Sequence, residues 1–445
     1  MPKASKATTS IASDRAVERY LPQSGSTTYS VARYTLDLRY RVATNRLDGV
    51  AIIHAVSTAR LRSFAFDLVG VRATKVKVEG KAARWRQSPT KLTVTPTLPL
   101  PEGQPFTVEV TYGGSPAPRR SRWGQIGWEE LEDGVIVAGQ PVGAPTWFPC
   151  NDRPSDKASY RIRVVTDPHY TVVANGELVR KGHVKAGVEW VFEQAEPTAT
   201  YLATVQIGRY VHTKMPAAGV PVELVHPRTE ARKVVADFSR LGDMLGVFTR
   251  RFGAYPFPSY RVVVTADDLE IPLEAQGIAV FGSNHADGDG DEERLVAHEL
   301  AHQWFGNSVG VGTWRDIWLN EGFACYAEWL WSEGSGRATA AELAAVHHGR
   351  LRTLPQDLLV GDPGPDLMFD DRLYKRGGLT LQALRTTIGD EPFFALLLDW
   401  TSSYRHAVAT TEDFIRLASR HAQHDLGDFF TGWLFTASLP PLPDS

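Results

Sequence analysis

The order of apolar and polar residues divides the chain into two parts of different character. Up to about residue 210, apolar residues recur at every second position, as in Tyr34-Thr35-Leu36-Asp37-Leu38-Arg39-Tyr40. This period is that of a β-strand with one face against a core. Asn175-Gly176 stands between two apolar runs, which predicts a tight β-hairpin. We therefore expect residues 21–213 to form an antiparallel β domain.

The pattern changes near Gly219, and we expect a second domain over residues 214–445. Glu230 to Arg251 and most of residues 338–434 have a helical composition, with only a few strands expected, among them Tyr260–Thr265 and Gly277–Phe281. Strands followed by helices favour an α+β multidomain fold, an N-terminal antiparallel β domain and then a mainly helical domain. Residues 1–20 are expected to be a disordered tail.

Composition narrows the possible partners and the compartment. The chain has 445 residues, 43% of them hydrophobic, with a formal net charge of −3. We find no long basic block and no apolar run of membrane-spanning length, so neither nucleic acid nor a membrane is an expected partner. The two cysteines form no disulfide framework, and the N-terminus lacks the apolar core of a secretion signal. These features favour a cytoplasmic protein; the oligomeric state stays open.

A metal-ligand motif carries the chemistry. In His298-Glu299-Leu300-Ala301-His302 the two histidines are four residues apart, so on a helix both imidazoles face one ion. Zinc binds tetrahedrally and keeps one position open for water in catalytic sites. Glu321 offers the third ligand from a second helix, and Glu299 lies where a general base toward zinc-activated water is needed. We expect one zinc ion per chain.

Local signals suggest where the two ligand helices begin. Asp291, Glu292 and Glu293 predict the start of the motif helix, and Asn320 is a plausible N-cap for the helix of Glu321. The run Asp287-Gly288-Asp289-Gly290-Asp291 resembles a calcium loop. Counted from Asp287, however, its sixth and twelfth positions are not the required Gly and Glu, so a polar turn is the better interpretation.

Three segments together resemble the zinc aminopeptidases related to aminopeptidase N and the leukotriene hydrolase/aminopeptidase, which are gluzincin metallopeptidases. They are His298-Glu299-Leu300-Ala301-His302-Gln303-Trp304-Phe305-Gly306-Asn307 with Trp318-Leu319-Asn320-Glu321-Gly322-Phe323-Ala324, then Trp147-Phe148-Pro149-Cys150-Asn151-Asp152, and Tyr374-Lys375-Arg376-Gly377-Gly378. The resemblance covers about residues 28–437. It implies a thermolysin-like catalytic domain in a short form without the long C-terminal helical domain of larger relatives.

The resemblance also implies how a substrate is held. It makes Glu274 the carboxylate that binds the free ammonium of a peptide, with Gln140 as a second contact and Tyr374 as the hydrogen-bond donor to the developing oxyanion. The segment Ile271-Pro272-Leu273 departs from the Gly-x-Met typical of the family, and Pro272 lacks a backbone N–H. This departure puts backbone contacts to the substrate in doubt.

The function expected from these residues is a zinc-dependent aminopeptidase that acts on peptides with a free N-terminus. Three alternatives stay open. A thermolysin-type zinc endopeptidase would share the metal site but has no need of Glu274. An epoxide hydrolase could use the same site, and a non-enzymatic scaffold of the same fold would be expected to have lost a catalytic residue.

Overall fold

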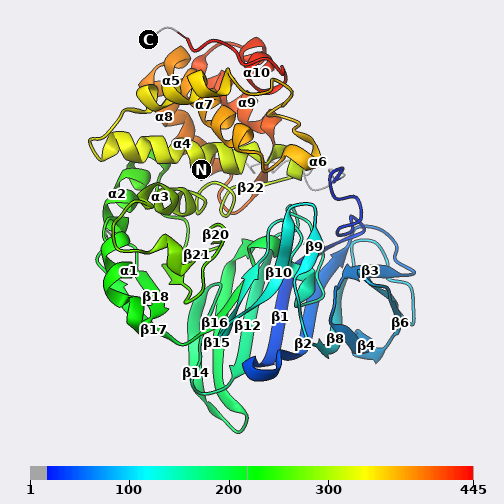
Figure 1. The fold of residues 1–445 in the computed structure, drawn as a ribbon. Coiled ribbons are helices and arrows are strands. Elements are labelled where there is room, and N and C mark those ends of the chain that lie inside the picture. Colours follow the sequence, from blue (N-terminus) through cyan, green and yellow to red (C-terminus); the bar gives the residue numbers. More distant parts are fainter. Residues whose placement is uncertain (1–17, 218, 444–445) are drawn as a thin grey trace, which may run out of the picture.

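A β-rich N-terminal domain and a helical catalytic domain make up the computed structural model, which describes residues 18–217 and 219–443. The N-terminal strands are β1 (Tyr29–Arg41), β2 (Arg46–Ser57), β3 (Phe64–Asp67), β4 (Arg72–Val78), β5 (Lys81–Ala82), β6 (Arg84–Gln87), β7 (Lys91–Thr95), β8 (Pro105–Gly114), β9 (Arg119–Ser121), β10 (Gly124–Leu131), β11 (Gly134–Ala138), β12 (Ala158–Thr166), β13 (Thr171–Ala174), β14 (Glu177–Val184), β15 (Gly187–Thr198) and β16 (Val205–Gly208). Figure 1 shows these strands at one end of the molecule and most helices at the other.

The strand period predicted from the sequence is visible in the largest sheet. Its order is β14-β15-β12-β1-β2-β8-β4-β5, and residues along β1 alternate between buried and more exposed positions. The N-terminal β domain is therefore confirmed. One pair departs from the expected antiparallel arrangement, because β1 and β12 run parallel. These two strands are far apart in sequence, so no tight turn forces them to run in opposite directions.

The hairpin predicted at Asn175-Gly176 is wrong. The strand before it, β13, belongs to a sheet of order β13-β16-β11-β10-β9, whereas β14 joins the eight-stranded sheet. Asn175 is buried, and its Nδ2 donates to the carbonyl oxygens of Leu202 at 2.8 Å and Gln276 at 3.0 Å. Its Oδ1 accepts from the backbone N–H of Thr204 at 2.6 Å. The side chain therefore bridges distant segments where the chain passes from one sheet to the other.

The catalytic domain contains a small sheet and a group of helices. Its strands are β17 (Tyr210–Met215), β18 (Val222–Pro227), β19 (Tyr260–Val264), β20 (Leu273–Ala275), β21 (Ile278–Phe281), β22 (Gly310–Val311) and β23 (Val408–Ala409). Its helices are α1 (Ala231–Asp237), α2 (Leu241–Phe252), α3 (Glu293–Ala301), α4 (Trp318–Gly334), α5 (Ala340–Leu351), α6 (Gly364–Leu367), α7 (Asp371–Ile388), α8 (Asp390–Ser403), α9 (Thr411–Ala422) and α10 (Gly427–Leu434). Within the described ranges, no helix is long and apolar enough to cross a membrane.

Two expected boundaries meet the structure differently. The division expected between residues 213 and 214 falls inside β17. This strand pairs with β18, so the sheet of the catalytic domain already begins at Tyr210. Most of the tail expected at residues 1–20 lies outside the described residues. Its last residues are not a tail, because Tyr20 is buried and its hydroxyl donates to Asp362, while Glu18 accepts from the backbone N–H of Trp314 at 2.9 Å.

The N-cap role expected for Asn320 is also wrong. Helix α4 begins at Trp318, and the backbone N–H of Asn320 already donates to the carbonyl of Ile317 at 2.9 Å. A short 3₁₀ turn over Trp314–Asp316 leads into the helix, so the chain is turning before it reaches Asn320. The Asn320 amide instead donates to the Tyr201 hydroxyl at 3.3 Å.

Helices α4 and α7 touch through two glycines. A Cβ atom on Gly377 would lie 2.6 Å from the Cα of Gly322, and one on Gly322 would lie 2.8 Å from the Cα of Gly377. Real Cβ contacts are not this short, so only glycine permits the two main chains to approach so closely. The contact lies one residue beyond Glu321 on α4 and three residues beyond Tyr374 on α7.

The two domains share polar and apolar contacts. Lys157 is half-buried, and its Nζ donates to the carbonyls of Asn307 at 2.9 Å and Ser308 at 2.8 Å in the catalytic domain. Ile136 and Val173 of the N-terminal domain pack in one apolar cluster with residues of the catalytic sheet such as Ile278. These contacts join the N-terminal domain to the catalytic domain.

Candidate active site

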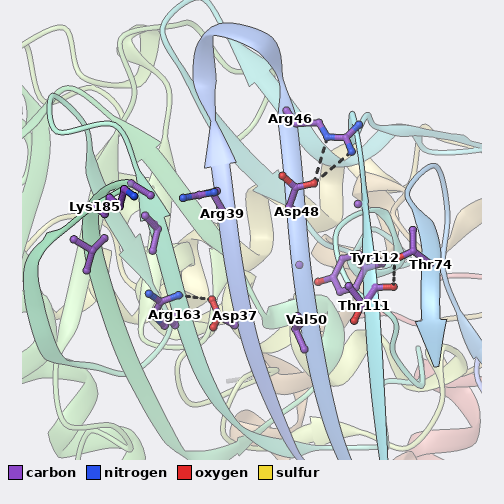
Figure 2. Close-up of a pocket in the computed structure, with 15 residues that line it drawn as sticks. Asp37, Arg39, Arg46, Asp48, Val50, Thr74, Thr111, Tyr112, Arg163 and Lys185 are labelled. Atoms are coloured by element: carbon purple, nitrogen blue, oxygen red, sulfur yellow. Dashed lines mark hydrogen bonds and ion pairs between the residues drawn. The ribbon is translucent and has the colours of Figure 1, made fainter. Parts of the chain in front are cut away.

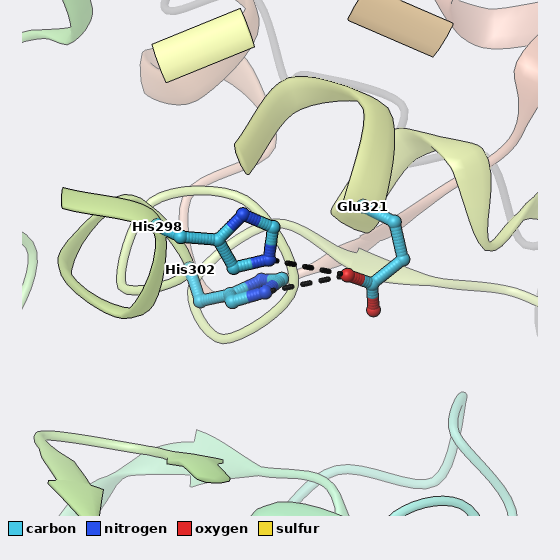
Figure 3. Close-up of side chains that lie close together, drawn as sticks. All are labelled: His298, His302 and Glu321. Atoms are coloured by element: carbon cyan, nitrogen blue, oxygen red, sulfur yellow. Dashed lines mark ion pairs between the residues drawn. The ribbon is translucent and has the colours of Figure 1, made fainter. Parts of the chain in front are cut away.

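The three predicted metal ligands lie together. His298 is on α3, His302 follows its last residue, and Glu321 is in the first turn of α4. The Nε2 atoms of His298 and His302 lie 3.6 and 3.5 Å from Oε2 of Glu321, and Figure 3 shows both rings pointing at this carboxylate. The three side chains are buried, and their ligand atoms lie within 4.8 Å of one another.

The other ring nitrogen of each histidine is held by a hydrogen bond. Nδ1 of His298 lies 2.7 Å from Oε1 of Glu328, and Nδ1 of His302 lies 3.1 Å from the carbonyl oxygen of Phe305. Both partners are acceptors, so Nδ1 carries the proton and Nε2 of each ring is left for a metal.

Glu328 is a functional residue that sequence reasoning missed. It lies on α4 seven residues after Glu321, so it shares a helix face with that ligand two turns further along. Although burial opposes its charge, the bond from His298 and the charges of Lys375 and Arg294 hold the pKa of Glu328 at about 2. The spacing from Glu321 is the signal that could have found it.

The charges of the cluster suit a divalent cation. Burial disfavours an imidazolium, but hydrogen bonds that His298 donates to the carboxylates of Glu321 and Glu328 raise its pKa to about 9. Burial likewise opposes a charge on Glu321, yet the two histidines lower its pKa to about 2. A site that favours positive charge among two imidazoles and a carboxylate fits the donor set of catalytic zinc.

Glu299 and Tyr374 face this cluster. Oε2 of Glu299 is buried and has no hydrogen-bond partner among the described residues, as expected of a group that acts on a bound molecule. The Tyr374 ring stacks on the His298 ring with centroids 6.1 Å apart. Burial and the neighbouring carboxylates, Glu321 first among them, raise the pKa of Tyr374 well above its usual value, so its hydroxyl remains a donor.

Glu274 lies next to the metal ligands, on the edge strand β20. A carboxylate oxygen of Glu274, a carboxylate oxygen of Glu299 and a ring nitrogen of His302 all lie within 4.8 Å of one another. Burial raises the pKa of Glu274 to about 8; the charge of His302 opposes this shift and those of Glu321 and Glu299 add to it. A cationic group bound beside Glu274 would stabilise its charged form.

These side chains line one cavity of about 760 Å³ between the domains. It is lined from the catalytic domain by α3, α4, α7 and the segment before β20, and from the N-terminal domain by β10, β11 and Gln140. Nε2 of Gln140 is buried without a partner in the part of the chain that the structure describes. Pro272 and the exposed Ile271 also line the cavity, so the departure from the family segment lies at its wall.

A second hollow lies on the outer face of the eight-stranded sheet and has a different character (Figure 2). Four of its charged side chains form two pairs, Arg163 with Asp37 and Arg46 with Asp48 at 3.4 Å. The side chains that line it include no histidine or cysteine. We therefore assign the chemistry to the cavity between the domains.

Comparison with known proteins agrees with this site. Residues 30–202 match the peptidase M1 N-terminal domain, and residues 240–433 match the peptidase family M1 domain. The fold and the buried metal-ligand cluster place the chain among the zinc metallopeptidases. It belongs to peptidase family M1.

Individual relatives show how far the similarity extends. An M1 zinc metallopeptidase from Deinococcus radiodurans, crystallised as a mutant with a Tyr-Ser-Ala substrate, superposes with a TM-score of 0.88 at 27% identity, over 96% of this chain and 99% of that one. Leucyl aminopeptidase of Saccharolobus solfataricus is 24% identical over 92% of this chain and 54% of its own length. Yeast LTA4 hydrolase, 18% identical, shares the fold with a TM-score of 0.79, over 94% of this chain and 69% of its own. The chain spans about half the length of the curated relatives that it matches over most of its own length.

Proposed function

We propose that this protein is a zinc-dependent aminopeptidase that removes the first residue of peptides with a free N-terminus. The observation that carries the proposal is the Glu274 carboxylate, which is half-buried beside the metal-ligand cluster. A carboxylate that is partly withdrawn from solvent and lies close to other carboxylates is stabilised by a cationic partner. The ammonium of a peptide supplies one and leaves only the first peptide bond near the metal ligands. The tripeptide substrate of the Deinococcus relative supports a peptide substrate here.

His298, His302 and Glu321 would hold one zinc ion through two imidazole nitrogens and a carboxylate oxygen. When bound, zinc acts as a Lewis acid that polarises the peptide carbonyl and makes water acidic enough to give up a proton near neutral pH. Glu328 and the carbonyl of Phe305 keep the two rings in the tautomer and orientation that binding requires.

Glu299 would accept the proton of the attacking water and deliver it to the leaving amine. Its buried, unpartnered Oε2 supports this role, since burial also raises the pKa of Glu299 and makes it a better base. The Tyr374 hydroxyl would donate to the oxygen on which negative charge develops. Gln140 would assist Glu274 in holding the substrate amine, a role supported by its unpartnered Nε2 in the same cavity.

The cytoplasm remains the proposed location. Cys150 and Cys325 are both free thiols and both buried, as is usual for proteins of a reducing compartment.

The test is hydrolysis of aminoacyl amidomethylcoumarins by zinc-loaded protein, each compared with its N-acetylated form. Free-amine substrates should be cleaved and acetylated ones rejected. A chelator should abolish the activity, and zinc should restore it. Internal cleavage of acetylated peptides at rates near those of free peptides would replace the proposal with a zinc endopeptidase.

A matched variant separates binding from chemistry. Glu299→Gln should retain zinc, measured by metal analysis, and lose activity by about 10²- to 10⁴-fold, because an amide cannot accept the proton. A variant that keeps its zinc and loses less than about tenfold, well below that range, would remove Glu299 from the role of base.

A further inference from the structure

The cavity has a wall that the proposed chemistry does not use. It is formed by β10 and β11 of the N-terminal domain, and Figure 1 shows β10 beneath the helical domain. The two strands pair antiparallel, with Glu129 opposite Ile136 and Gly127 opposite Ala138. Gln140, the proposed contact for the substrate amine, follows β11 by two residues. Side chains on this wall therefore face the position of the first substrate residue.

Glu129 is an unusual residue for such a wall. It is half-buried and lines the cavity, and within the described ranges no cation or hydrogen-bond donor pairs with its carboxylate. Burial and the nearby charge of Asp267 raise the pKa of Glu129. Asp267 is itself bound by the backbone N–H of Glu132 at 2.9 Å. Glu129 on the wall and Asp267 on the loop after β19 are thus two carboxylates close enough to repel each other.

The other charged side chains of the cavity do not offset the negative charge of Glu129 and Asp267. Apart from the histidines of the metal-ligand cluster, its cationic side chains are Arg294 and Lys375, which both lie near Glu328, at 3.2 and 3.9 Å. Asp268 and Glu270, on the loop before β20, add two further carboxylates to the lining. A positively charged side chain would find partners here, and a negatively charged one would be repelled.

The approach to Glu129 is apolar. Trp123, Ile126 and Ile136 line the same cavity, and Phe369 packs edge-on against Trp123 with ring centroids 5.8 Å apart. Such walls suit the methylene stems of lysine and arginine, which bury their carbons while the charged end reaches a polar partner. Gln140 and Ile136 are four positions apart, so a residue held at Gln140 needs a long side chain to reach Glu129.

We propose that the enzyme prefers peptides whose first residue is lysine or arginine, and that Glu129 determines this preference by pairing with the basic side chain. This inference rests on the proposed aminopeptidase function. Ala138, between Gln140 and Glu129 on the wall, leaves space for the stem of that side chain.

Matched pairs of amidomethylcoumarin substrates test the preference. Arginine is compared with neutral citrulline and lysine with norleucine, so that only charge and hydrogen bonding differ. In the wild-type enzyme kcat/KM should be about tenfold higher for each basic substrate than for its neutral partner. This ratio is at the low end of the effect of a charge-assisted hydrogen bond, because Glu129 is half-exposed. Glu129→Gln should remove this ratio and leave kcat/KM for citrulline and norleucine unchanged. Glu129→Lys should favour a glutamate substrate over a lysine substrate.

Glu130→Gln is the matched control, because Glu130 is the next residue on β10, is exposed and does not line the cavity. It should leave every ratio at the wild-type value. Equal rates on arginine and citrulline in the wild type, or equal losses on both in Glu129→Gln, would overturn the inference. Cleavage of free-amine but not acetylated substrates would then still support the proposed function. If zinc-loaded protein cleaves no free-amine substrate, the proposed function fails and the preference fails with it.

Discussion

Glu328 is the residue whose substitution tests the metal site most directly without removing a ligand. Its carboxylate accepts from Nδ1 of His298 at 2.7 Å and pairs with Arg294 at 3.2 Å, in surroundings where its side chain is 3% exposed. Glu328→Gln keeps an oxygen that can accept from His298 but removes the negative charge. Glu328→Ala removes both, and leaves a buried N–H and two cations without this partner.

The size of the effect follows from this environment. A hydrogen bond to a charged group contributes about 1.5–3 kcal/mol, and near-complete burial means that solvent does not screen it. At about 1.4 kcal/mol per factor of ten, Glu328→Ala should weaken zinc binding by about 10- to 100-fold. Glu328→Gln should weaken zinc binding by about tenfold or less, because the amide oxygen can still accept from His298.

Zinc affinity is measured by competition with a chelator of known affinity, and kcat/KM is measured at saturating zinc. Glu333→Gln is the control, since Glu333 lies on the same helix but pairs with Arg385 at 3.2 Å and does not line the cavity. If folded Glu328→Ala binds zinc as tightly as the wild type, the hydrogen bond to His298 does not support the metal site and the reasoning is refuted.

Three further substitutions test other contacts. Tyr374→Phe should lower kcat by about 10²- to 10³-fold with little change in KM, because its hydroxyl acts on charge formed in the transition state; an effect on KM alone would make it a ground-state contact. Gly377→Ala should force α7 away from α4 and reduce kcat by up to about 10²-fold. Gly378→Ala should be milder, because the atom nearest its Cβ, at 3.0 Å, belongs to the Trp329 ring and not to main chain; equal effects on kcat would contradict this. Asn175→Ala should lower the free energy of unfolding by at least ~1–3 kcal/mol, because the substitution leaves buried backbone groups unpaired. The midpoint of thermal unfolding should fall accordingly; an unchanged midpoint would refute the bridging role of Asn175.

The parts of the site that could be predicted are those set by spacing along one helix. The interval between His298 and His302 fixes their shared face whatever the rest of the chain does. Glu328 has the same kind of relation to Glu321, but its role depends on which side of α4 meets α3, and this is decided by packing. Glu129 could not be recognised at all, because its position in the cavity depends on how one domain sits on the other.

The strand pattern predicted the β domain for a similar reason, since alternation is a local property. The error at Asn175-Gly176 has the opposite cause. Its turn signal is local, yet Asn175 bonds to Leu202, Thr204 and Gln276, all distant in sequence. Local preference fails where a side chain serves partners that a short window does not contain.

The glycine contact between α4 and α7 separates what can vary in this enzyme from what cannot. Main chain meets main chain at Gly322 and Gly377, so no side-chain rotation can alter the spacing between the helices that carry Glu321 and Tyr374. The wall that bears Glu129 belongs to the other domain and takes no part in this contact. Substitutions there can change which first residue is accepted while the reacting groups keep their separation, so the choice of substrate can evolve without disturbing the chemistry.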